Sequence, residues 1–115
     1  MTREHLLSCI LNAFPYPIVF VDKEYVIRYM NREAVFRYEK CRGLENLIGT
    51  SVLERVANEK EQKEIKEATK QFEHGGTEVY AGVTDRNMRK YYVPVRDKEG
   101  CYIGYYERLE FNREL

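Results

Sequence analysis

The chain has 115 residues, 43% hydrophobic and 33% charged, so its length and composition fit a single globular domain and exclude a disordered segment. Lysine plus arginine and aspartate plus glutamate number 19 each, and this zero net charge excludes the positive excess that nucleic acids or acidic membrane surfaces attract. With no apolar run long enough to cross a bilayer, no secretory signal and three dispersed cysteines, we expect a cytoplasmic protein with reduced thiols.

The first predicted element is an amphipathic helix over residues 3–14, which Thr2 can cap. Its apolar residues recur at steps of three and four and form one face: Leu6, Leu7, Ile10, Leu11 and Phe14.

Two short runs rich in β-branched and aromatic residues, at 18–21 and 25–30, each fit a strand. The polar break at residues 22–24 is short enough for a tight hairpin. Asn31 then suits an N-cap, which accepts a hydrogen bond from an otherwise unpaired N–H in the first turn of a new helix. These residues predict a β-hairpin that leads directly into a helix.

The segment after the hairpin is less regular. A short helix is expected over residues 32–38, followed by an irregular stretch whose apolar side chains should point inward. Ser51 and Glu54 have the spacing of a capping box, in which the hydroxyl accepts from the N–H of Glu54 while the carboxylate reaches back.

A long, very polar helix is predicted over residues 58–74. Asn58 with Glu61 repeats the capping-box pattern at its start, and Gly75 suits its end. The apolar residues form only a narrow stripe, so the helix should lie on the surface with one edge inward: Ile65, Ala68 and Phe72.

Three strands follow, over residues 77–84, 89–96 and 101–111. Polar turn residues separate them at 85–87 and at 97–100. Because side chains alternate along a strand, the second strand is expected to direct Tyr91 and Val93 inward, and the third Tyr105 and Glu107.

The element order, strand–strand–helices–strand–strand–strand, favours an α+β fold with a five-stranded antiparallel sheet and helices on one face. This order resembles that of a PAS domain over roughly residues 5–111. Residues 21–22 and 29–34 resemble the aliphatic-Asp and aromatic-x-Asn-x-x-Ala signature of that family. Residues 93–104 resemble its apolar-Pro-apolar-x-Asp-x-x-Gly-x-x-x-Gly hairpin.

The resemblance divides the chain into an N-terminal dimerisation helix (residues 1–14), a PAS domain (15–111) and a C-terminal tail (112–115). It implies a sensory or regulatory module of signal transduction rather than an enzyme. Such a module binds a small molecule or cofactor, forms a homodimer, or does both. In PAS domains a leading helix covers its own sheet or packs against the copy of a partner, and we favour the dimer interface here.

Two alternatives to a ligand-binding sensor stay open. One is a ligand-free dimerisation domain, and the other is an enzyme on a similar α+β scaffold, for which only Glu107 offers acid–base chemistry. The implied effector is a histidine kinase or a transcription regulator. The family's Asp-aliphatic-Thr exit motif is replaced at residues 110–113, and the chain is either a stand-alone module or a piece of a longer protein.

The resemblance does not identify a cofactor. The light-sensing flavin branch has an Asn before and a Gln after its reactive Cys-Arg pair, and both are missing around Cys41. A haem-binding PAS domain needs an axial histidine, and His74 is the candidate near the long helix. We expect His74 to interact with the helix C-terminus instead.

The expected pocket wall consists of residues predicted to face inward, a set that also suits an ordinary packed core: Phe20, Met30, Phe36, Leu47, Ile48, Val52, Leu53, Ile65, Phe72, Tyr91, Val93, Tyr105 and Glu107. Glu107 interrupts an apolar strand face, where a carboxylate is costly unless it is paired or protonated. Either Glu107 orients a polar ligand group, or a bulge turns it outward or a tyrosine or arginine satisfies it. We favour the second interpretation.

Overall fold

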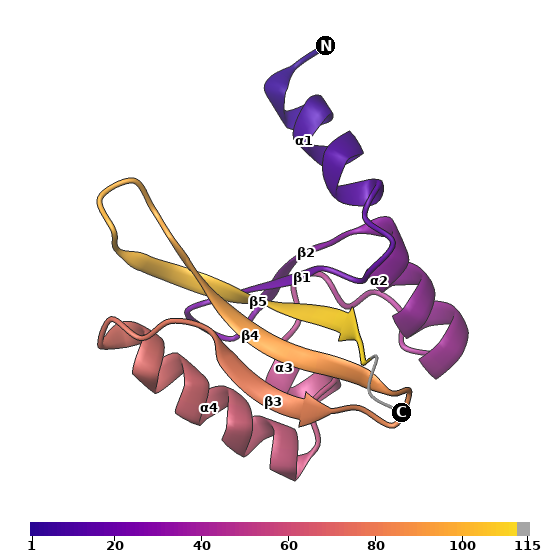
Figure 1. Ribbon diagram of the computed structural model, residues 1–115. Helices are drawn as coiled ribbons and strands as arrows, with labels where there is room; N and C mark the ends of the chain where they lie inside the picture. The colour runs from indigo at the N-terminus through magenta and orange to yellow at the C-terminus, as the bar shows by residue number, and fades with distance from the viewer. Residues whose placement is uncertain (113–115) are drawn as a thin grey trace.

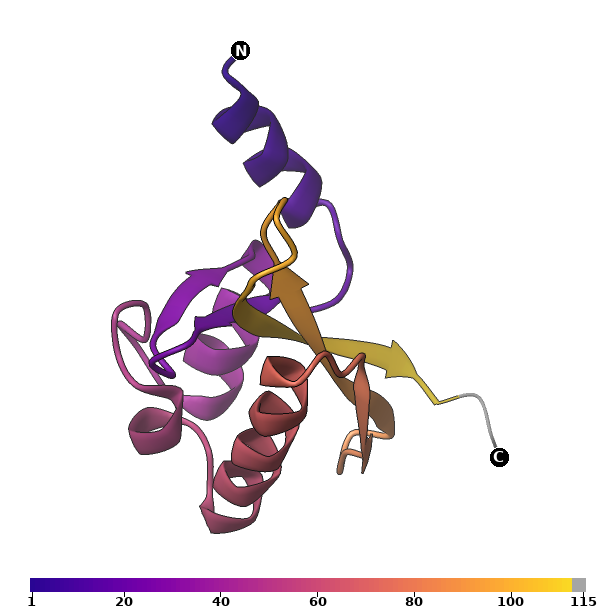
Figure 2. The same ribbon diagram turned by 90° about the vertical axis from the view of Figure 1, so that its left-hand side faces the viewer.

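The computed structural model describes residues 1–112. One antiparallel sheet with strand order β2-β1-β5-β4-β3 carries the later helices on one face, which we call the inner face, while the first helix points away (Figure 1, Figure 2). The expected α+β architecture is therefore confirmed. No helix within the described residues is long and apolar enough to span a bilayer. The elements are α1 (Arg3–Asn12), β1 (Val19–Asp22), β2 (Ile27–Met30), α2 (Arg32–Phe36), the π-helix η1 (Arg37–Cys41), α3 (Val52–Arg55), α4 (Glu59–Glu73), β3 (Val79–Val83), β4 (Met88–Arg96) and β5 (Tyr102–Phe111).

Asn31 is fully buried and joins the hairpin to the segments around it. Its Oδ1 accepts from the N–H of Ala34 at 3.0 Å, which confirms the predicted N-cap, and from the N–H of Ile18 at 2.9 Å. Its Nδ2 donates to the carbonyl groups of Leu11 and Tyr16, both at 3.0 Å. One side chain thus fixes the start of α2, the end of α1 and the segment that enters β1.

The chain beyond α2 differs in detail from the prediction. It continues as a π-helix as far as Cys41, a wider turn than the short α-helix that was expected. The Ser51 side chain makes no cap bond, so the first predicted capping box is wrong, and the backbone of Ser51 pairs with Val26 in an isolated β-bridge. The second is confirmed at the start of α4, where Asn58 and Glu61 exchange bonds of 2.9 and 3.4 Å.

The core lies between the inner face of the sheet and α4. The predicted stripe of α4 is buried, with Ile65 and Phe72 almost fully enclosed. The rings of Tyr92 and Tyr105 pack edge to face from the sheet side, with centroids 5.7 Å apart. Arg96 donates to the carbonyl of Phe72 at 2.7 Å, and this bond holds the end of α4 against β4.

The inward face of β4 is the opposite of the predicted one. Tyr92 lies in the core, whereas Tyr91 and Val93 point to the outer face, where the guanidinium of Arg108 lies 4.4 Å from the centre of the Tyr91 ring. The adjacent tyrosines look alike in the sequence, so alternation alone could not select the register. A shift of one residue then reverses every side chain of the strand.

We expect Asn31→Ala to lower the free energy of unfolding by about 3 kcal/mol, because it removes a helix cap and three further hydrogen bonds of a fully buried side chain. Asn58→Ala is the matched control. It removes the cap of α4 at an exposed position and should cost only about 1 kcal/mol. Urea unfolding followed by circular dichroism measures both values. Equal losses would show that Asn31 acts only as a helix cap.

Candidate functional site

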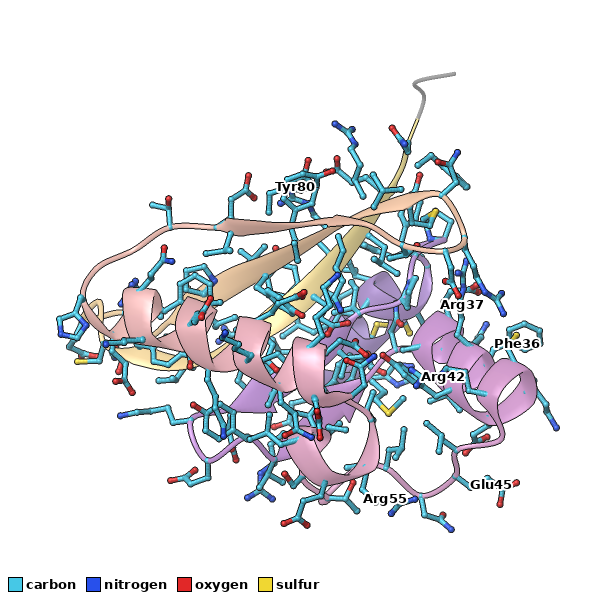
Figure 3. The ribbon with its side chains drawn as sticks, turned by 90° about the horizontal axis from the view of Figure 1, so that it is seen from below. Phe36, Arg37, Arg42, Glu45, Arg55 and Tyr80 are labelled. Atoms are coloured by element: carbon cyan, nitrogen blue, oxygen red, sulfur yellow. The ribbon has the colours of Figure 1, made fainter. Side chains whose placement is uncertain are left out.

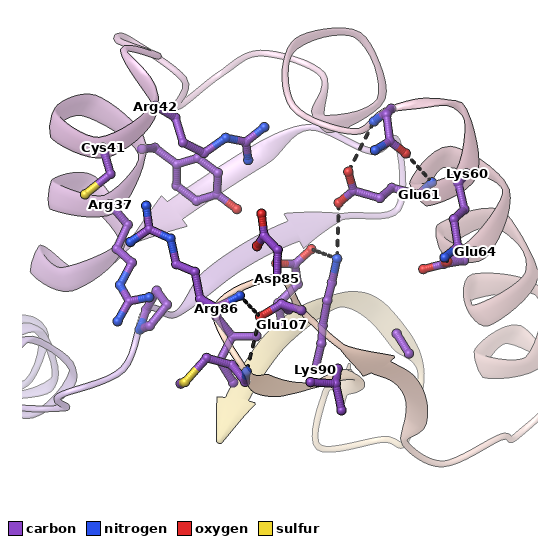
Figure 4. Close-up of a pocket in the computed structure, with 18 residues that line it drawn as sticks. Arg37, Cys41, Arg42, Lys60, Glu61, Glu64, Asp85, Arg86, Lys90 and Glu107 are labelled. Atoms are coloured by element: carbon purple, nitrogen blue, oxygen red, sulfur yellow. Dashed lines mark hydrogen bonds and ion pairs between the residues drawn. The ribbon is translucent and has the colours of Figure 1, made fainter. Parts of the chain in front are cut away.

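A hollow of about 560 Å³ opens at one end of the inner sheet face, and we call it the polar groove. Its volume falls within the range of ligand pockets. Four parts of the chain build its walls: η1 with the residue after it, the start of α4, the β3–β4 hairpin and the end of β5 (Figure 3, Figure 4). The lining residues are Pro17, Arg37, Tyr38, Cys41, Arg42, Asn58, Lys60, Glu61, Glu64, Ala81, Val83, Thr84, Asp85, Arg86, Met88, Lys90, Glu107 and Leu109.

Lys90 reaches from β4 between two carboxylates of the polar groove (Figure 4). Its Nζ lies 3.2 Å from Oε2 of Glu61 and 3.8 Å from Oε1 of Glu107, and the side chains of Lys90 and Glu107 are only 12% and 16% exposed. Burial alone would lower the pKa of Lys90, but the charges of Glu107 and Glu61 hold this pKa above its ordinary value. One charged ammonium is therefore shared by two carboxylates.

Glu107 points inward, as its place on the strand predicted. Its partner is Lys90, so the favoured interpretation, which turned it outward or paired it with a tyrosine or arginine, is wrong. Tyrosine rings surround this pair. Burial, reinforced by the negative charge of Glu107, raises the pKa of Tyr38, Tyr92 and Tyr105 well above the ordinary value. Their hydroxyl groups therefore stay protonated over the physiological range.

The η1 side of the polar groove and the β3–β4 hairpin carry three arginines. Nε of Arg37 lies 3.3 Å from Glu33, and the guanidinium of Arg42 lies 5.3 Å from the centre of the Tyr38 ring. Within the described part of the chain, neither Arg42 nor Arg86 forms an ion pair. Guanidinium groups bind carboxylates and phosphates through paired hydrogen bonds, so this wall can accept an anion.

The residues predicted to line a pocket fall into groups. The largest group is packed core: Met30, Leu47, Val52, Ile65, Phe72 and Tyr105, with Leu53 packed against it. A second group lies on the outer sheet face: Phe20, Tyr91 and Val93. Phe36 and Ile48 are 54% and 56% exposed. Glu107 is the member of the set that lines the polar groove.

Phe20 is misplaced in the prediction because it lies within a continuous apolar run. Its neighbour Val21 takes the inward position, and the ring of Phe20 lies on the other face, against Gly104. A β-carbon at Gly104 would stand 2.6 Å from that ring, which explains the glycine.

Phe36 and Ile48 were also predicted to face inward, and both are exposed. Ala34 is the buried residue of α2, and Phe36, two positions later, lies on the opposite side of the helix. Ile48 borders a separate hollow of about 260 Å³ beside α2, which Met30 and Leu47 also line.

The lining of the polar groove was not predicted from the sequence, because its polar residues come from distant segments and each resembles an ordinary solvent-exposed residue. One signal was present in the sequence: Lys90 shares strand parity with Met88 and Tyr92, so an inward Tyr92 requires an inward lysine. Nδ1 of His74 lies 2.8 Å from the carbonyl of Lys70, a contact with the C-terminus of α4 as expected. No group of three metal-ligating side chains occurs within residues 1–112.

Comparisons with known proteins extend this description. A family model described as a PAS fold matches residues 11–110. No curated protein matches the chain. Solved structures are similar in fold, among them a C-terminal domain from Streptococcus mutans, with 22% identity, coverage of 96% of this chain and 85% of that one, and a TM-score of 0.77.

Two further structures come from sensor kinases. A sensory box sensor histidine kinase from Vibrio cholerae has 14% identity, covers 93% of this chain and 90% of that one, and gives a TM-score of 0.60. The PAS domain of the histidine kinase ThkA has 20% identity, with coverage of 83% and 98% and a TM-score of 0.59.

We expect Lys90→Met to lower the free energy of unfolding by about 2 kcal/mol, because it leaves Glu61 and Glu107 facing each other without a counter-charge. The double variant Lys90→Met/Glu107→Gln should recover most of this loss. Lys60→Met is the control, since that side chain is 87% exposed and should contribute little.

The pH dependence follows from the raised pKa of Lys90. A raised pKa in the folded state gives stability that is fully present below the unfolded value of about 10.4 and is lost as the pH rises through the folded value. The difference in the free energy of unfolding between wild type and Lys90→Met should therefore stay constant from about pH 7 to 9, as measured by urea unfolding. A difference that fades across this range would contradict the assignment.

Proposed function

The chain belongs to the PAS fold family, and on that premise we propose that it is a sensory module of signal transduction that binds a small molecule in the polar groove. The observation that carries the proposal is the largely buried Lys90–Glu107 pair, which lines a hollow of ligand size. Charged side chains on an inner sheet face cost free energy that apolar residues of similar volume would avoid. A polar ligand that uses these charges accounts for their presence.

Binding can act on the fold because the walls of the polar groove belong to different elements. Residues of η1, α4 and the β3–β4 hairpin all face it, so a ligand that bridges them favours one spacing between helices and sheet. Such a ligand shifts the population of arrangements by no more than its difference in affinity between them. The effector that reads this shift is proposed to be a histidine kinase or a transcription regulator.

Native mass spectrometry of the protein purified from its own host, with an absorption spectrum of the same sample, tests this proposal. We expect a bound mass, because a sensor with micromolar or tighter affinity retains its ligand at cellular concentrations. Glu107→Gln purified in the same way should lose that mass, while Arg3→Gln, on exposed α1, should keep it. A clean mass of the free chain in both samples would contradict ligand binding.

A second candidate, a dimerisation domain, is favoured by a separate observation. No residue of α1 is buried, the helix points away from the body (Figure 1), and Leu6, Leu7, Ile10 and Phe14 are each about half exposed. We propose a second copy of the chain as the partner, with Leu11 in the same interface. A helix of about 15 Å is too short to bury about 800 Å² per partner, so the contact must also use the outer sheet face, where Tyr80 and Ile103 are exposed.

We expect Leu7→Glu and Ile10→Glu to convert the dimer into a monomer, because each places a charge in the apolar contact. His5→Glu adds a similar charge outside the apolar face and is the matched control. Size-exclusion chromatography with light scattering gives the masses. A wild-type chain that stays monomeric at high micromolar concentration would exclude the dimer, whereas ligand retained by monomeric Leu7→Glu would separate sensing from association.

A further inference from the structure

The charged side chains of the polar groove are unevenly distributed, with only arginines on the η1 side, and this inference rests on the proposed function of that groove. Arg37 and Arg42 come from the η1 side, and Arg86 comes from the β3–β4 hairpin (Figure 4). Only Arg37 has a carboxylate partner within the described residues, and that partner, Glu33, lies outside the groove lining. Two guanidinium groups are therefore available to an anion.

The α4 and sheet side has an excess of carboxylates, with Glu61, Glu64 and Glu107 against Lys60 and Lys90. Glu61 and Glu107 share the single ammonium of Lys90, and the distance of 3.8 Å to Glu107 is longer than a hydrogen bond. Glu107 therefore keeps acceptor capacity for a second cationic donor. Asp85, next to Arg86 on the hairpin, adds a carboxylate that makes no ion pair within the described residues.

The surroundings of Glu107 strengthen its preference for a cation. The hydroxyl of Tyr105, two residues before it on the same strand face, is buried and has no hydrogen-bond partner within residues 1–112. Glu107 thus lies against a buried aromatic wall, and attraction between charges is stronger in such a setting than in bulk solvent.

We propose that the polar groove binds a zwitterionic small molecule, an α-amino acid or a related amino-carboxylate, with its carboxylate on Arg42 and Arg86 and its ammonium on Glu107 and Asp85. A simple dicarboxylate or a phosphate compound would satisfy the arginines but would face the carboxylates of Glu61 and Glu107. An apolar ligand would leave both sets of charges desolvated. The zwitterion is the class that matches both walls.

Isothermal titration calorimetry with the twenty protein α-amino acids, β-alanine and γ-aminobutyrate at pH 7.5 tests the class. Each compound that binds is compared with two analogues, one that lacks the amino group and one that lacks the carboxyl group. We expect at least one zwitterion to bind and both analogues to bind at least tenfold more weakly, because each leaves one wall unpaired. No binding by any zwitterion, or equal binding by the deaminated analogue, would overturn the proposal.

Single variants test which residues bind the carboxylate of the ligand and which bind its ammonium group. The affinity for the zwitterion should fall at least tenfold in each of four single variants: Arg42→Gln, Arg86→Gln, Asp85→Asn and Glu107→Gln. Arg3→Gln should leave this affinity unchanged. Urea unfolding of each variant checks that it is folded. Failure here is distinguishable from failure of the proposed function. If native mass spectrometry finds a host-derived ligand that lacks either charge, the zwitterion proposal is wrong and the proposed sensory function stands. A chain that carries no ligand contradicts both proposals.

Discussion

The four hydrogen bonds of Asn31 are the constraint on which the arrangement of the rest depends. They meet at the point where the hairpin ends and the helices begin, and they are satisfied by backbone groups from three separate segments. Because the amide is fully buried, none of its partners can exchange it for water without cost. The direction in which α2 leaves β2 is thereby set. Since η1 continues α2, the position of one wall of the polar groove is set with it.

The opposite wall depends on a different balance. On the inner sheet face the apolar core gives way to Lys90 and Glu107 within one strand pairing, where Tyr92 stands opposite Glu107. The ring of Tyr92 packs beside the ammonium of Lys90, while Glu61 of α4 supplies the second carboxylate. A filled apolar core at this end would be at least as stable, because buried ion pairs seldom repay the cost of desolvation. The structure thus keeps a polar, hollow end beside a packed one.

The sequence predicts those features of the fold that depend on nearby residues, and it does not predict those that depend on packing between distant segments. Asn31, the stripe of α4 and the cap at Asn58 were predictable, since each depends on residues a few positions apart along the chain. Strand faces were harder. The run Val19–Val21 and the pair Tyr91–Tyr92 are apolar on both sides, so period-two alternation carries no information there, and packing against α4 decides.

The lining of the polar groove could not be predicted in this way. The apolar pattern of the sequence predicts the core, because the same side chains that could enclose a ligand also fill space when packed. The groove is instead built from arginines and carboxylates that are ordinary surface residues in their local sequence and meet only through the sheet topology.

The same topology links the groove to the first helix. The N–H of Arg32 donates to Oδ1 of Asn12 at 2.7 Å, beside the bond from Asn31 to the carbonyl of Leu11. Apart from these polar contacts, α1 buries none of its residues against the body. Since η1 follows α2 directly, these bonds join one wall of the groove to the end of α1. A contiguous element can carry energetic coupling where both sites bias its position, and under the proposed function α2 with η1 is the segment that would couple the ligand to α1.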